Sequence, residues 1–75
     1  MSYSSLSKAL ARVRVASKES PIAILKTNNT GKFETLFAAT ESGRRYIAEH
    51  NDRLIGIYHK KNVDTKTLKR ELQNV

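Results

Sequence analysis

The fold is decided by residues 21–37, which read Pro21-Ile22-Ala23-Ile24-Leu25-Lys26-Thr27-Asn28-Asn29-Thr30-Gly31-Lys32-Phe33-Glu34-Thr35-Leu36-Phe37. Residues 22–27 are largely apolar and β-branched, which predicts a strand. Asn and Gly at 28–31 accept positive φ and therefore indicate a turn. Residues 33–39 predict a returning strand, so the segment forms a hairpin with Lys26 and Lys32 near its tip.

An amphipathic helix is predicted before the hairpin, over residues 4–19. Leu6, Leu10 and Val13 fall at the i, i+4, i+7 spacing of one helical face. A serine at position 4 or 5 can cap its first turn by accepting a backbone N–H bond. The helix must end before Pro21, because proline lacks an N–H and forces the preceding residue into an extended conformation.

Three further elements are predicted after the hairpin. A short helix covers 41–50 behind Thr40 as its cap, although Gly43 should weaken it by about 1 kcal/mol relative to alanine. A strand covers 54–58, and a last helix runs from Thr65 to about Gln73 behind Asp64 as its cap. The chain is therefore expected to be one small α+β domain, residues 1–75, in the order α-β-β-α-β-α with a central hairpin. Phe33, Phe37 and Tyr46 are expected in its core.

The length of 75 residues limits the core that this domain can build. Domains of this size often need disulfides, a metal or self-association, and the chain has no cysteine. Two histidines do not make a structural metal site alone, so no metal or other cofactor is expected. Self-association is the remaining route, and a homodimer is the expected state.

The charge balance points to a polyanionic partner. Fourteen Lys and Arg stand against seven Asp and Glu, for a net charge of +7. Such a balance favours phosphate-rich partners through counterion release. No segment approaches the ~20 apolar residues of a membrane span, and the first residues lack the pattern of a signal peptide. We therefore expect a cytoplasmic protein that does not associate with membranes.

No constellation of residues indicates catalysis or a small-molecule substrate. A catalytic triad needs a serine, a histidine and an aspartate that converge in one pocket. The sequence contains no G-x-S-x-G motif, which would mark the nucleophilic serine of such a triad. His50 and His59 have no third ligand at a recognisable metal spacing. Thr30-Gly31-Lys32 lacks the first glycine and the following helix of a phosphate-binding loop. The chain is not expected to be an enzyme.

The first third of the chain is nearly free of acidic residues. Glu19 is the single acid among residues 1–33, against six basic residues. An ordinary solvated face mixes both signs, so this imbalance favours contact with phosphates. The candidate nucleic-acid-binding residues are Lys8, Arg12, Arg14, Lys18, Lys26 and Lys32. A second basic group, at 44, 45 and 53, is interrupted by acids, and a third occupies residues 60–70.

The order of elements over residues 2–50 resembles the Phd/YefM antitoxin family. The resemblance rests on Ser2-Tyr3-Ser4 before the first helix, on Ser20-Pro21-Ile22-Ala23-Ile24-Leu25-Lys26, and on the turn, strand and short helix that follow. It implies a dimeric DNA-binding domain that acts as a transcriptional repressor, with a C-terminal segment that masks a toxin. Lys26 falls where the family often has Arg, and Lys8 is the basic residue nearest the family's DNA-contacting Arg.

The C-terminal part, residues 51–75, departs from that family. Antitoxin tails are typically acidic, whereas residues 59–75 are basic and predicted to be helical. This part is a possible partner-binding segment, with candidate contact residues Leu54, Ile57, Tyr58, Leu68 and Leu72. Two alternatives to the DNA-binding regulator therefore stay open. One is a small phage- or plasmid-type factor that binds and modulates a host protein, and the other is an RNA- or ribosome-binding protein.

Overall fold

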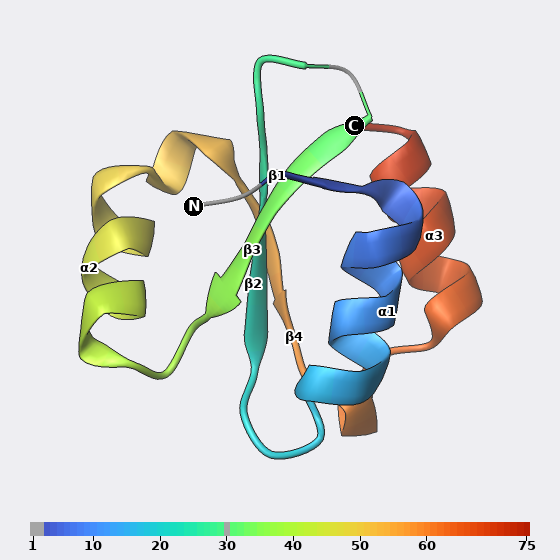
Figure 1. Cartoon of the computed structure of the whole chain (residues 1–75), viewed down its shortest axis with the longest axis horizontal. Helices are drawn as coiled ribbons and strands as arrows, with labels where there is room; N and C mark the ends of the chain where they lie inside the picture. Colours follow the sequence, from blue (N-terminus) through green and yellow to red (C-terminus); the bar gives the residue numbers. More distant parts are fainter. Residues whose placement is uncertain (1–2, 30) are drawn as a thin grey trace.

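A four-stranded antiparallel sheet forms the centre of the molecule, with helices on both faces (Figure 1). The computed structural model describes residues 3–29 and 31–75. The strand order is β1-β3-β2-β4. In chain order the elements are β1 (Tyr3–Ser5), α1 (Leu6–Ala16), β2 (Ile22–Lys26), β3 (Lys32–Phe37), α2 (Glu41–Glu49), the 3-10 turn η1 (Asn51–Arg53), β4 (Leu54–Tyr58), the 3-10 turn η2 (Lys60–Asn62) and α3 (Thr65–Gln73).

The α+β class and the order α-β-β-α-β-α are confirmed, and a short strand precedes them. This strand, β1, occupies the first residues of the predicted helix 4–19 and pairs Ser4 with Phe33 of β3. The Ser5 side chain then caps α1 by accepting the Lys8 N–H at 3.4 Å. The capping serine is thus the second of the two candidates, and the residues before it extend the sheet.

Helix α1 ends at Ala16, three residues before the predicted limit. The Ser17 hydroxyl donates to the Val13 carbonyl, which closes the last turn. The Ser17 carbonyl accepts the Lys60 N–H at 3.3 Å. Because this carbonyl binds η2, the end of α1 is attached to the segment that leads into α3.

The hairpin is formed as predicted, with β2 paired to β3 from Ile22 opposite Phe37 to Lys26 opposite Phe33. Gly31 has a φ of 80°, which is the left-handed conformation expected of the turn. The Thr27 hydroxyl accepts the Asn29 N–H at 3.1 Å and donates to the Lys32 carbonyl at 3.0 Å. Thr30 of the predicted turn lies outside the described residues.

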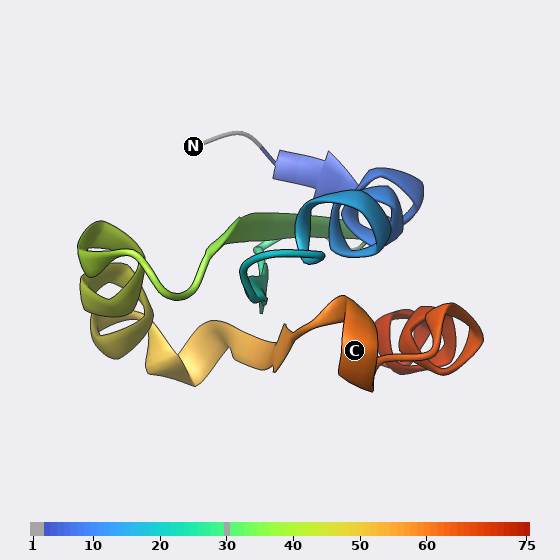
Figure 2. The same cartoon turned by 90° about the horizontal axis from the view of Figure 1, so that it is seen from below.

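Strand β2 is one of the two inner strands of the sheet and is buried on both faces. Ile22 and Ile24 pack with α1 and α3 on one face, while Ala23 and Leu25 pack with α2 on the other. Figure 2 shows the resulting three layers, with α2 on one side of the sheet and α1 and α3 side by side on the other. We call the layer formed by α1 and α3 the two-helix layer.

The three aromatic residues that were predicted to lie in the core differ in their exposure to solvent. Phe33 is buried and Tyr46 is half-buried, but Phe37 is 46% exposed, so its expected place in the core is wrong. Phe37 lies at the end of β3, beyond the three residues that β1 covers. Its ring borders the last residues of α1, among them Val15, which is also exposed.

Gly43 in the first turn of α2 is a requirement of the fold. The Thr40 hydroxyl caps this helix by accepting the Gly43 N–H at 3.0 Å. The same hydroxyl donates to the Phe37 carbonyl at 3.3 Å. A Cβ on Gly43 would lie 1.9 Å from that carbonyl oxygen. The helix therefore starts against the end of β3 with no room for a side chain.

We expect Gly43→Ala to lower the free energy of unfolding by about 1–3 kcal/mol, because overpacking against backbone outweighs the gain in helix propensity. Urea titration followed by circular dichroism measures this change. Ser42→Ala is the matched control, because Ser42 is exposed and the change should stay within about 0.5 kcal/mol. A higher urea midpoint for Gly43→Ala would contradict the steric argument.

Candidate nucleic-acid interface

The two-helix layer is held on the sheet by a small set of apolar side chains. Ala9 and Val13 of α1 and Leu68 and Leu72 of α3 are all at most 2% exposed and belong to one core cluster. The helices run in opposite directions beside each other (Figure 1). Because one face of each helix is fixed to the core, the residues on the opposite face of each helix are directed away from the sheet.

Most of the net charge of the protein lies in this layer and its flanking turns. Residues 6–19 and 60–75 hold nine basic and three acidic side chains, which accounts for six of the seven net positive charges. The nine basic residues, all exposed, are Lys8, Arg12, Arg14, Lys18, Lys60, Lys61, Lys66, Lys69 and Arg70. The first and third basic groups of the sequence are therefore brought together on one side of the sheet.

Two of the three acids in these segments serve local structure. Asp64 caps α3 by accepting the Lys66 N–H at 3.4 Å and the Thr67 hydroxyl at 3.2 Å. Glu71 accepts the Tyr58 hydroxyl at 3.3 Å. Burial, together with the nearby Glu71 carboxylate, raises the pKa of Tyr58 to about 12. Among residues 3–29 and 31–75, no ion pair neutralises a basic residue of this layer.

The two flanks of α1 face different neighbours. Arg12 donates to the Thr35 hydroxyl on β3 at 3.2 Å, so its flank, which also carries Lys8, lies toward β3. Arg14 falls on the opposite flank by the 3.6-residue period, and this flank faces α3, whereas Lys18 lies in the turn after the helix. On α3, Glu71 lies toward Tyr58 of β4, which places Lys69 on the flank nearer α1. Basic side chains thus border the line between the two helices.

Lys26 and Lys32, the other two predicted contacts, are exposed at the base of the hairpin turn. They border a shallow cavity of about 160 Å³ whose lining includes Val75, the last residue of the chain. The hairpin turn therefore lies beside the end of α3, as Figure 1 shows. These two lysines extend the basic layer at one end and do not contribute to its centre.

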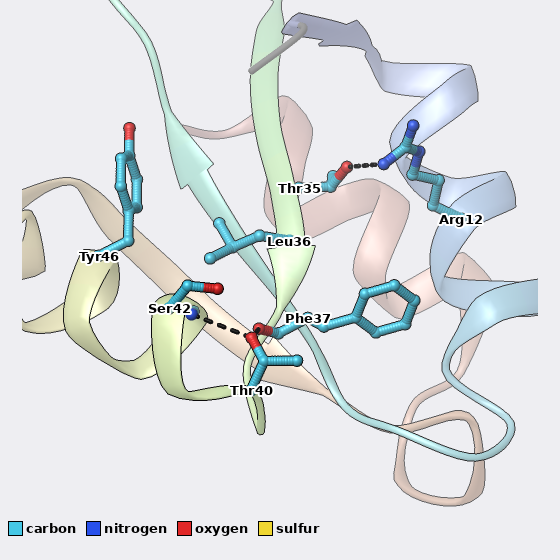
Figure 3. A pocket seen from close by; sticks show the side chains of 8 residues that line it. Arg12, Thr35, Leu36, Phe37, Thr40, Ser42 and Tyr46 are labelled. Carbon is cyan, nitrogen blue, oxygen red and sulfur yellow. Dashed lines mark hydrogen bonds between the residues drawn. The ribbon is translucent and has the colours of Figure 1, made fainter.

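A second cavity, of about 540 Å³, opens between α1, β3 and the start of α2 (Figure 3). Arg12 and Thr35 line one side, Thr40 and Ser42 line the other, and Leu36 and Phe37 lie between them. The described lining residues carry hydroxyls and one guanidinium, but no carboxylate or imidazole. Tyr46 supplies a phenolic hydroxyl to the same lining.

The second basic group lies on the opposite face, and two of its three members, Arg45 and Arg53, are paired with acids. Arg53 contacts Glu34 at 2.6 Å, and Arg45 contacts Glu41 at 3.3 Å. Glu34 is only 3% exposed, on the face of β3 that α2 covers. Tyr46 donates to Glu34 at 2.5 Å, and Arg53 also donates to the Tyr46 hydroxyl at 2.9 Å. We call Glu34, Tyr46 and Arg53 the buried polar triad.

The buried polar triad fixes the protonation state of its members. Burial alone would raise the pKa of the Glu34 carboxyl, but the hydrogen bonds from Tyr46 and Arg53 outweigh burial and lower it below its ordinary value. The hydrogen bond to Glu34 raises the pKa of Tyr46, and the same carboxylate raises the pKa of Arg53. The ring of His50 lies 4.3 Å from that of Tyr46. The triad thus attaches α2 and η1 to the sheet.

We expect Glu34→Gln to lower the free energy of unfolding by about 1–3 kcal/mol at pH 7, because it removes a charge-assisted bond from a buried site. Because the pKa of Glu34 is lower in the folded state than in the unfolded state, the ionised carboxylate stabilises the fold. This stabilisation is complete at pH values above the unfolded-state pKa, and it is lost as the pH falls through the folded-state pKa. The difference between variant and wild type should therefore shrink below about pH 4.

Urea titrations between pH 3 and pH 7 measure this dependence. Glu41→Gln is the control, because its ion pair with Arg45 is exposed and should contribute little. An equal cost for Glu34→Gln at pH 3 and at pH 7 would show that the carboxylate charge is not what stabilises the triad.

The predicted partner-binding residues are divided between core and surface. Leu68 and Leu72 lie in the core of this chain, and Leu54 and Tyr58 are half-buried. Ile57 is 51% exposed at the margin of the sheet. In this conformation Ile57 is therefore the member of the set best placed to contact another molecule.

Sequence reasoning identified the basic residues of α1 but did not place those of α3 in the same surface. The signal was present in residues 60–75, where five basic residues accompany a clear apolar line at Leu68 and Leu72. Within the described part of the chain, no helix could cross a membrane. The same ranges contain no cluster of three His, Cys, Asp or Glu suited to a metal ion.

A comparison of the chain with protein-family models, curated proteins and solved structures gave no significant match. The resemblance to the Phd/YefM family over residues 2–50 therefore stays a prediction.

Proposed function

We propose that the protein binds duplex DNA through the two-helix layer and acts as an antitoxin-like transcriptional regulator. The observation that carries this proposal is the partition of charge. Six of seven net positive charges lie in the two-helix layer together with its flanking turns, residues 6–19 and 60–75. The described ion pairs, by contrast, lie with α2 on the other face. Unpaired cations gathered on one face are what phosphate binding requires.

The acids of the layer support this interpretation. Asp64 caps α3 and therefore lies at the N-terminal end of the helix. Glu71 accepts a hydrogen bond from Tyr58 and therefore lies on the flank of α3 that faces β4. Their positions leave Arg14, Lys69 and Arg70 without an acidic neighbour in hydrogen-bonding contact. A face of this kind attracts a polyanion at long range and then binds phosphates one by one.

We expect the double substitution Arg14→Ala/Lys69→Ala to weaken binding to a short DNA duplex by about tenfold or more, because it removes two phosphate contacts. The slope of log K against log salt should fall by roughly one unit for each lost contact. Fluorescence anisotropy across a salt series measures both quantities.

The matched control is Arg44→Ala/Arg45→Ala, which removes the same net charge from α2 on the opposite face. It should change the affinity about twofold or less, as long-range electrostatics alone would. Equal losses in the two double variants would contradict the assignment of the interface to the two-helix layer. Failure of wild-type protein to bind duplex DNA at ~50 mM salt would contradict the proposed function itself.

Competition between duplex DNA and structured RNA tests the alternative of an RNA- or ribosome-binding protein, because the charge distribution fits both. Preferential displacement of DNA by RNA in that assay would favour the RNA-binding alternative. Antitoxin activity is a separate part of the proposal, and coexpression with a candidate toxin tests it, with rescue of growth as the expected result.

A further inference from the structure

The cavity of about 540 Å³ opens at the outer edge of β3, where the described pairing with β1 ends. Among the described residues, β1 pairs with β3 as far as Glu34, so residues 35–37 lie beyond that pairing. Helix α1 borders this part of β3 from one face of the sheet, and the start of α2 borders it from the other (Figure 3). The volume falls within the roughly 300–1,000 Å³ that is typical of small-molecule sites.

Both walls of the cavity are held to the same strand by hydrogen bonds. On the α1 side, the Arg12 guanidinium donates to the Thr35 hydroxyl at 3.2 Å. On the α2 side, the Thr40 hydroxyl donates to the Phe37 carbonyl at 3.3 Å, and the absence of a Cβ at Gly43 lets α2 start against that carbonyl. The walls are therefore in place without a ligand, which lowers the entropic cost of binding one.

The lining between the two walls is apolar and open to solvent. Leu36 is half-buried, and the exposed ring of Phe37 lies beside it at the end of β3. Tyr46 borders the same region, and its hydroxyl is bound to Glu34 in the buried polar triad. Exposed apolar surface beside a cavity is typical of a binding site. A ligand with a hydrocarbon body would remove this surface from water.

Arg12 gives the cavity one positive charge, and the described lining residues include no carboxylate to neutralise it. The ion pairs of the described chain involve Arg45 and Arg53 instead. A guanidinium has several N–H donors, and the described bond to Thr35 occupies one of them. The remaining donors are sufficient for a bidentate contact with a carboxylate, which is the strong form of this interaction.

From these features we propose that the cavity binds a small monocarboxylate with an aromatic or aliphatic body. The carboxylate pairs with Arg12, and the hydrocarbon body lies over Leu36 and Phe37 toward the start of α2. One guanidinium matches one negative charge. A phosphate dianion would instead keep an uncompensated charge beside apolar side chains, which is unfavourable.

This site is separate from the centre of the basic layer. Arg12 lies on the flank of α1 toward β3, whereas Arg14 and Lys69 lie toward the line between α1 and α3. A carboxylate in the cavity neutralises Arg12 and leaves the other two cations exposed. The proposal therefore does not rest on nucleic-acid binding, and each of the two can fail without the other.

NMR titration of the isotope-labelled full chain with 2-naphthoate, 4-phenylbutyrate and octanoate tests the proposal. We expect at least one of these acids to bind with a Kd of about 1 mM or tighter. The largest shift changes should occur at the amides of Thr35, Leu36 and Gly43, which line the cavity. The uncharged amide of the same acid should bind about tenfold more weakly, because it cannot pair with Arg12.

Two pairs of matched variants assign the binding to this cavity. Arg12→Gln should weaken binding about tenfold or more, whereas Arg14→Gln, which removes the same charge from the opposite flank of α1, should change the Kd about twofold or less. Phe37→Ala should weaken binding about fivefold, whereas Val15→Ala, which truncates another exposed apolar side chain, should leave it unchanged. The amide spectrum of each variant checks that it folds.

Three results would overturn the proposal. The first is the absence of shift changes at the cavity amides with all three acids up to about 5 mM. The second is an equal loss of binding in Arg12→Gln and Arg14→Gln, which would show that the acids are attracted by the basic surface as a whole. The third is equal binding of an acid and its amide, which would remove the role of the Arg12 charge.

Discussion

The structure depends on one constraint, which is the burial of β2 on both faces. Ile22, Ala23, Ile24 and Leu25 are each at most 2% exposed, although successive side chains point to opposite sides of the sheet. A chain of this length must therefore build a covering layer on each face. α1 and α3 cover one face from the two ends of the chain, and α2 covers the other. The buried polar triad completes the thinner α2 side.

Local sequence signals were sufficient for most elements of the fold. The hairpin, the strand Leu54–Tyr58 and the helix Thr65–Gln73 follow from periodicity, turn residues and the Asp64 cap, because these act within a few residues. The strand β1 could not be predicted in this way, since its three residues are set by pairing with β3. The exposure of Phe37 and the contact of Gly43 with the Phe37 carbonyl also depend on tertiary packing.

For the candidate interface, too, local sequence patterns predict some residues, whereas the placement of others depends on tertiary structure. The basic flanks of α1 follow from helical spacing, so Arg12 and Arg14 could be predicted as surface residues. That the basic helix α3 lies beside them could not be predicted, because the sheet order places the two ends of the chain on one face. Basic residues that are far apart in sequence therefore form one surface. Acidic residues instead have structural roles, with Asp64 as the cap of α3 and Glu34 in the buried polar triad.

The position of β2 between β3 and β4 also governs how the chain folds as it is synthesised. The hairpin leaves the ribosome before β4, so Ile22 and Ile24 have one strand neighbour until residue 58 follows. The face under α3 stays open for longer, until Leu68 and Leu72 emerge. Nascent chains cut short near residue 50 would expose the central strand to other chains, a setting in which misassembly and chaperone binding compete with folding. β4 and α3 thus complete the covering of β2 that the hairpin and α1 begin.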